Sequence, residues 1–357
     1  MPIEESPLDS VVEKSVEAVN EDWSNERVEE LRSLLNVASD SNQNRDERLK
    51  AIDDIRAKEN IPAYLRNEIF DKMSGMMKDV SENHLIRTES LGCIERPIRK
   101  RLLFGRTWTK PDEMDMRTFD FLSDFAKDIN ADGEIRQDIA WSFKSLVHSV
   151  LSKDEKADKR VLDFVNDRVN SRDDAEVRVA YIRALKGAMG RKDVSTLNKE
   201  EYITSITQHL FDEKEDMLLR KESIFVLYRI FMSEGVDVTR KKEIWESLTK
   251  IFLDKKEDIE LRKEPAEVFE YILCAPEQKE HFGSGKALLE NLLFDEGEDP
   301  KLRAHIGWVL RYMLEHNKIT ENKEWATKIL ERIRASSGYE RLLGHVKVSK
   351  TGERRWF

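Results

Sequence analysis

The chain has little of what secreted, membrane and disordered proteins need. Its 357 residues include only 2 cysteines, 8 prolines and 14 glycines. Cys93 and Cys274 lie far apart and cannot form the dense disulfide framework of a small secreted domain, which favours a reducing compartment. The longest apolar runs, such as 224–228, are much shorter than the roughly 18 residues of a membrane-spanning helix, and the acidic start MPIEESPLDS lacks a signal-peptide core. We therefore expect a soluble, cytoplasmic protein with no membrane partner.

An excess of positive charge is also lacking. The sequence has 71 acidic and 61 basic residues, for a formal net charge of -10. Such a field repels nucleic acids and anionic membranes except where basic residues cluster locally. Apolar residues make up 39% and charged residues 37%, which is typical of a folded, helix-rich chain with enough apolar material for a core.

An internal repeat organises most of the chain. Five segments read DGEIR, DAEVR, DMLLR, DIELR and DPKLR, with an Asp four residues before each Arg. An Asp at this place indicates a helix N-cap, where it accepts hydrogen bonds from unpaired backbone N–H groups. The arginines recur every 41 or 42 residues, at Arg136, Arg178, Arg220, Arg262 and Arg303.

Each copy of the repeat predicts two helices. After the Arg, apolar residues follow the helical period, as in Ile224, Leu227 and Ile230. Before the Asp lies another amphipathic stretch, such as 202–211 or 243–253. Neither helix can bury its apolar face alone, so neighbouring pairs must stack.

This pattern resembles the HEAT and PBS-lyase-like repeats, in which an Asp lies in the turn and an Arg early in the second helix. The resemblance implies an all-α fold, an α-solenoid of about seven HEAT-like antiparallel helix pairs with a 42-residue period and a short non-helical C-terminal tail. It covers 113–316 well. The match is looser at 46–50 and 83–87, with Lys50 or Arg87 at the Arg position.

The same pattern predicts the organisation of the chain. Pro265 lies beyond the first turn of its helix, which should kink or begin late. The expected segments are an N-terminal extension (1–20), looser pairs (21–104), a long loop (105–113), regular repeats (114–320), a terminal capping helix (321–338) and a tail or hairpin (339–357).

Motifs for catalysis were sought and are not evident. No two histidines have the i, i+4 spacing of a helical metal site, and the His-Glu dipeptide of the HEAT-like deoxyhypusine hydroxylases does not occur. The sequence GSGK at 283–286 lacks the first Gly and the final Ser or Thr of a phosphate loop, so we expect Ser284 to cap a helix instead. We expect no catalytic residue, no metal and no cofactor. A HEAT-fold enzyme such as an alkylpurine DNA glycosylase or a lyase is the enzymatic alternative, but no catalytic Asp can be assigned to it.

The predicted partner site follows from positions that vary between copies. Counted from the repeat Arg, positions +3 and +7 are mostly apolar and must form the core, whereas +1, +5 and +8 lie within about 60° of one another on another face. Exposed Trp, Tyr and Arg dominate protein interfaces. The alternative is that the aromatic members extend the core. We predict that a protein or peptide binds these +5 and +8 residues: Trp141, Lys144, Arg183, Lys186, Phe225, Tyr228, Glu267, Trp308 and Arg311.

A basic run is the second candidate site. It could bind an acidic peptide, a phosphate or a nucleic-acid backbone, or could simply complement the dipole of a helix C-terminus. On balance the sequence predicts a non-catalytic scaffold or adaptor that binds a protein or peptide along the surface of the second helices, which the resemblance to HEAT-like solenoids implies is the concave face. A nucleic-acid-binding protein is the other alternative. The run comprises Arg96, Arg99, Lys100, Arg101, Arg106 and Trp108.

Overall fold

The computed structural model describes most of the chain, and every regular element in the described ranges is helical. The chain forms two compact units, Met1–Ala188 and Met189–Phe357. No described helix is long and apolar enough to cross a membrane. The expected N-terminal extension, almost all of the long loop and the C-terminal tail lie outside the described residues, which are 23–59, 61–103, 113–128, 131–151, 155–192, 194–316 and 320–335.

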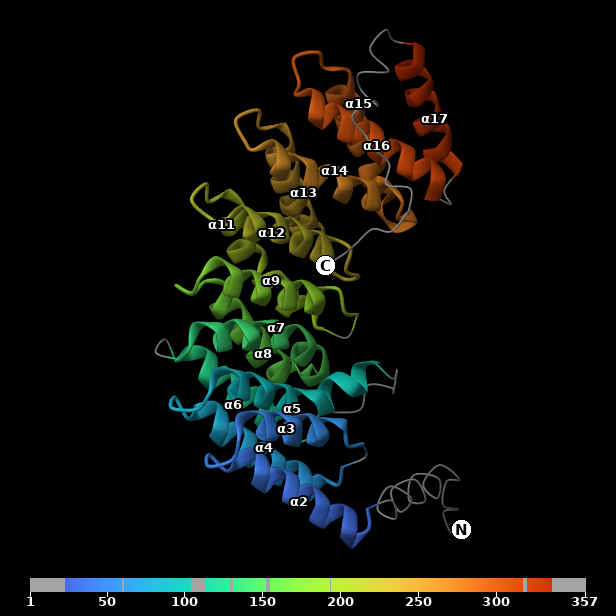
Figure 1. Ribbon diagram of the computed structural model, residues 1–357. Helices are drawn as coiled ribbons and strands as arrows, with labels where there is room; N and C mark the ends of the chain where they lie inside the picture. The colour runs from blue at the N-terminus through green and yellow to red at the C-terminus, as the bar shows by residue number, and fades with distance from the viewer. Residues whose placement is uncertain are drawn as a thin grey trace, which may run out of the picture. The chain divides into compact units, whose positions relative to one another are not determined.

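The described residues of the first unit form four successive helix pairs, which follow one another from α2 to α9 in Figure 1. The second helices α3, α5 and α7 contact one another in order, as do α2 and α4. This stacking of antiparallel pairs is the arrangement of an α-solenoid. The bounds are α2 Asn25–Ser39, α3 Arg45–Ala57, α4 Ala63–Lys78, α5 His84–Leu103, α6 Glu113–Lys127, α7 Gly133–Val150, α8 Glu155–Val169 and α9 Ala175–Met189.

The second unit repeats the arrangement. The second helices α12, α14 and α16 stack in order, and α17 packs on α16. The bounds are α10 Thr196–Glu201, α11 Ile203–Phe211, α12 Met217–Phe231, α13 Val238–Leu253, α14 Ile259–Leu273, the 3-10 helix η1 Pro276–His281, α15 Phe282–Phe294, α16 Pro300–His316 and α17 Thr320–Ala335.

The repeated Asp caps the second helices, as predicted. Asp132, Asp216 and Asp258 each accept hydrogen bonds from backbone N–H groups two or three residues ahead. Helix α14 begins directly after Asp258 and continues through Pro265, so of the two expected effects of Pro265, a kink or a late start, the late start does not occur. A cap at Asp258 fixes the first turn, and the Pro265 ring is buried within the helix.

The repeated Arg ties three elements together. Its Nε donates to the penultimate carbonyl of the preceding helix at 2.9–3.1 Å, where an unpaired carbonyl and the negative end of the helix dipole favour a cation. In the first pair this residue is Arg48; the Lys50 assignment was therefore wrong by two residues. The arginines that make this bond are Arg48, Arg87, Arg220, Arg262 and Arg303.

In four of these arginines, Arg48, Arg87, Arg220 and Arg262, the other end of the guanidinium reaches the next pair. Arg262 donates to both carboxylate oxygens of Glu298 at 2.8 and 2.7 Å, and the same carboxylate accepts the backbone N–H of Asp299 at 2.8 Å. Arg48 with Glu82 and Arg220 with Glu257 repeat this geometry. We call each such Arg–acid contact a rung. The rungs join successive pairs, which supports a structural role for the repeated Arg.

Candidate functional site

The core positions of the repeat are buried, as predicted. Positions +3 and +7 from the repeat Arg are fully or almost fully inaccessible in every regular copy. They differ in chemistry: position +3 is aliphatic in Ile139 and Ile306 but polar in Ser223, whose Oγ donates to the carbonyl of Leu219 at 2.9 Å. Among the +5 and +8 residues, Glu270 is buried with 2% of its surface accessible, and the others keep part of their surface accessible.

The first unit carries four of the predicted residues. Trp141 and Lys144 on α7 are exposed, whereas Arg183 and Lys186 on α9 are half-buried. Trp141 keeps 39% of its surface accessible. The guanidinium carbon of Arg183 lies 5.2 Å from the centre of the Trp141 ring, a cation–π contact. Trp141 therefore does not extend the core.

The second unit carries the other five. Phe225, Tyr228, Glu267 and Trp308 are half-buried and Arg311 is exposed. These intermediate values place the aromatic side chains at the edge of the core with part of each ring accessible. Partner binding by these residues stays a prediction.

Three neighbours were missed by the sequence reasoning. Trp308 stacks on His305 at 5.6 Å and on Tyr312 at 5.7 Å, and Tyr228 lies 5.5 Å from Tyr271, measured between ring centres. Tyr271 and Tyr312 occupy position +9, only about 40° around the helix from +5. Including position +9 in the predicted surface would have identified Tyr271 and Tyr312.

The imidazole of His305 is neutral at physiological pH. Burial lowers its pKa to about 4. The nearest carboxylate is that of Glu267, with an Oε1 to Nε2 distance of 3.7 Å. The aromatic stack around Trp308 therefore carries no charge from His305 at pH 7.

The cysteines offer no activated thiol. Burial, with a contribution from the carboxylate of Glu270, raises the pKa of Cys274 to about 12. A thiol with such a pKa stays protonated and is a weak nucleophile at neutral pH. Cys93 is buried, and its Sγ lies 3.5 Å from the carbonyl oxygen of Ile52.

The basic run cannot be assembled into a site. Arg96, Arg99, Lys100 and Arg101 belong to α5, but their side chains lie outside the described residues, as do Arg106 and Trp108 entirely.

The GSGK segment is not a loop. It lies within α15, where the Ser284 Oγ donates to the carbonyl of His281, so the prediction that Ser284 caps this helix is wrong.

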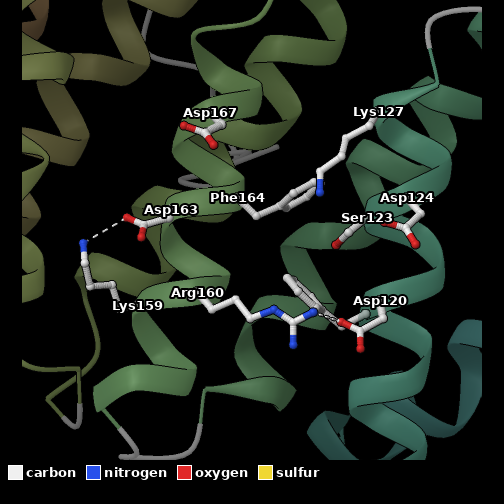
Figure 2. A pocket seen from close by; sticks show the side chains of 10 residues that line it. Asp120, Ser123, Asp124, Lys127, Lys159, Arg160, Asp163, Phe164 and Asp167 are labelled. Atoms are coloured by element: carbon white, nitrogen blue, oxygen red, sulfur yellow. Dashed lines mark hydrogen bonds and ion pairs between the residues drawn. The ribbon is translucent and has the colours of Figure 1, made fainter.

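A groove of about 630 Å³ lies between the first helices α6 and α8 (Figure 2). Arg160 pairs with Asp120, and its guanidinium lies 5.9 Å from the centre of the Phe119 ring. Lys127 similarly lies 5.5 Å from the Phe164 ring centre. These cations bridge the two helices, so the groove has a structural explanation. Among the described residues no group of three or more His, Cys, Asp or Glu side chains could hold a metal ion.

Comparisons with known proteins agree on fold only. No protein-family model matches the chain, and no curated protein matches it. A designed armadillo repeat protein in complex with the peptide (KR)4 is 13% identical with a TM-score of 0.40, covering 73% of this chain and 98% of that one. Human deoxyhypusine hydroxylase in complex with glycerol is 14% identical with a TM-score of 0.32, covering 86% and 97%. The chain is a helical-repeat solenoid similar to armadillo and HEAT-like proteins.

Proposed function

We propose that the protein is a non-catalytic scaffold or adaptor that binds a protein or peptide on the surface of its second helices. The observation that supports this most directly is the presence of two partly exposed aromatic groups in the second unit. They are the pair of Tyr228 and Tyr271 from α12 and α14 and the stack of His305, Trp308 and Tyr312 on α16. Ring faces held at a surface bury large apolar area on binding at a low cost in side-chain entropy.

Charges beside the aromatic rings suit polar recognition by the same surface. Arg311 is exposed next to Trp308, while Lys221 and Glu264 form an ion pair at 3.0 Å between α12 and α14. A hot spot of aromatic anchors surrounded by a polar rim is the usual anatomy of a protein interface. The proposal therefore assigns affinity to the rings and selectivity to the charges around them.

The test compares two tryptophans of the same unit. Peptide binders are selected against the immobilised wild-type chain from a random 12-residue display library, and their affinities are then measured for Trp308→Ala and Trp325→Ala. Trp325 is also half-buried but lies on α17, beside Lys286. We expect Trp308→Ala to weaken binding by at least about tenfold, because truncating a hot-spot residue typically costs about 2 kcal/mol or more. Trp325→Ala should change affinity by less than about twofold.

Equal losses in both variants, with circular dichroism showing both folded, would contradict the assignment of the surface. A pull-down with the Trp141→Ala, Trp308→Ala double variant, run with and without nuclease, extends the test to the first unit. Nuclease-sensitive capture that is unchanged in the double variant would favour nucleic-acid binding by the basic run.

A further inference from the structure

The rung between α7 and α9 differs from the others in composition. Asp173 stands directly before the cap residue, where Glu82, Glu257 and Glu298 stand in regular rungs. Its Oδ1 accepts from Nη1 of Arg136 at 2.5 Å. Its Oδ2 accepts from Nη2 of Arg168 and from the Ser171 hydroxyl. Two guanidinium groups therefore share one carboxylate, which leaves one positive charge uncompensated in this cluster.

The repeat itself shows that Arg168 is unusual. Val169 supplies the carbonyl that accepts from Nε of Arg178 at 2.7 Å, so Arg168 corresponds to the residue before that acceptor. Its counterparts are Val37, Met76, His209, Ile251 and Leu292. Of these only His209 also contacts the acid before the next cap, Glu215, at 3.0 Å, and none is an Arg or Lys.

Tyr181 is the second departure. It occupies position +3 of α9, where other copies have small or aliphatic residues, and only 1% of its surface is accessible. Its ring packs on Phe143 and Phe164, with ring-centre distances of 5.4 and 6.0 Å. Burial raises the pKa of the phenol, so the hydroxyl remains a hydrogen-bond donor. Phe164 lies one helical turn before Arg168 on α8, so the Tyr181 ring packs beside the end of α8 that carries Arg168, and the charges of Arg168, Asp173 and Arg136 act on the hydroxyl.

Three buried donor atoms in this cluster have no acceptor among the described residues. They are the Nε atoms of Arg136 and Arg168 and the hydroxyl of Tyr181. Both arginine side chains are only 14% exposed. Buried polar groups are nearly always hydrogen-bonded, and unpaired ones in a native structure indicate a missing water or ion. Here the missing group must accept hydrogen bonds, and a negative charge on it would also compensate the extra cation.

We propose that Arg136, Arg168 and Tyr181 form a binding site for a small free oxyanion, phosphate or sulfate, at the junction of α7, α8 and α9. Guanidinium N–H groups match the geometry of such oxygens and bind them with charge-assisted hydrogen bonds. The burial of all three side chains limits the ligand to an ion of this size. A single water molecule accepts at most two hydrogen bonds, so it could not satisfy all three donors, and it would leave the excess charge in place.

The test measures the melting temperature of the full chain in phosphate, sulfate or chloride at equal ionic strength. For wild type we expect about 20 mM phosphate or sulfate to raise it by about 3 °C over chloride, as for a ligand of millimolar affinity. Broadening of the phosphorus NMR line of added phosphate gives a second measure of binding that does not depend on stability.

Tyr181→Phe removes one donor atom, and Arg168→Met removes the extra cation. Both should abolish most of the oxyanion-specific gain and the line broadening. Arg160→Met is the matched control, because it removes one positive charge from the same helix at an exposed position. It should keep the gain. If phosphate and sulfate stabilise wild type no more than chloride, or if Tyr181→Phe retains the full effect, the site does not exist. Tyr181→Phe carries the test even where Arg168→Met fails to fold.

Discussion

At the scale of single residues, the rungs concentrate buried charge. Arg262 and Glu298 expose only 3% and 2% of their side chains. Removing a charge of this kind from water is costly, and it is offset here by four Arg262 bonds, two to Glu298 and two to the Phe252 carbonyl. Truncating Arg262 alone would therefore leave the Glu298 carboxylate without its counter-charge and the Phe252 carbonyl at the end of α13 without its donors.

Arg262→Met should accordingly lower the free energy of unfolding by about 3 to 5 kcal/mol, the usual cost of breaking a buried ion pair. Adding Glu298→Met should recover part of that loss, since the stranded carboxylate is removed as well. Urea unfolding at pH 7 measures both. The exposed pair of Arg32 and Glu68 is the control: Glu68→Gln should cost no more than about 1 kcal/mol. A double variant as unstable as the sum of its parts would show that the two residues do not act together.

Glu298 also predicts a pH dependence. The hydrogen bonds from Arg262 hold the pKa of its carboxyl below the usual range. An acid with a lowered pKa in the folded state adds stability above its unfolded pKa of about 4.3, and that stability is lost as the pH falls through the folded pKa. Wild type should thus exceed Glu298→Gln in stability at pH 7, and the difference should shrink below about pH 4. A difference that stays constant down to pH 3 would contradict this origin.

At the scale of elements, a cap decides where each second helix begins. The Asp216 Oδ1 accepts from the N–H groups of Leu218 at 2.8 Å and Leu219 at 3.3 Å, at the positive end of α12. The turn before it is polar, so the helix has no apolar staple to fix its start. The hydrogen bonds to the Asp216 carboxylate therefore fix the residue at which α12 begins.

Asp216→Ala should lower the free energy of unfolding by about 1 kcal/mol, because two backbone donors lose their acceptor. Asp216→Asn keeps an acceptor oxygen and should lower the free energy of unfolding by only a few tenths of a kcal/mol. Chemical denaturation of the three proteins distinguishes these values. Equal losses for Ala and Asn would mean that charge, and not the hydrogen bonds, determines the start of the helix.

The sequence predicts these elements well because caps and apolar spacing are local. It also contains the rung acid, five residues before the repeat Arg, as Glu82, Asp173, Glu257 and Glu298 show. In an acidic chain this carboxylate cannot be told from a solvent-exposed one, because only the stacking of pairs brings it to the Arg of the preceding pair. Where Ala131 replaces it, Arg87 reaches the cap residue Asp132 instead, at 3.5 Å. The aromatic stacks of the candidate surface were predicted only in part. Trp308 was predicted and Tyr271 was not, since the exposure of each depends on which helical face the neighbouring pair leaves open.

At the scale of the whole molecule, stability comes from contacts between successive pairs. The stacked second helices and the rungs join each pair to its chain neighbours within a unit. In such a one-dimensional array the loss of one interface lowers the stability of adjacent pairs and leaves distant ones nearly unchanged. The opening of one pair then need not unfold the rest of the chain.

Hydrogen exchange followed by mass spectrometry tests this locality. Arg262→Met removes a rung of the second unit, so amides of α13 to α16 should exchange faster while those of α2 to α5 keep their rates. Arg48→Met removes the equivalent rung with Glu82 in the first unit, so amides of α2 to α5 should exchange faster while those of α13 to α16 keep their rates. Because the two variants delete the same contact at different places, they control for each other. Uniform acceleration along the chain in both would mean that the protein unfolds as one cooperative body, and that the rungs stabilise it globally instead of pair by pair.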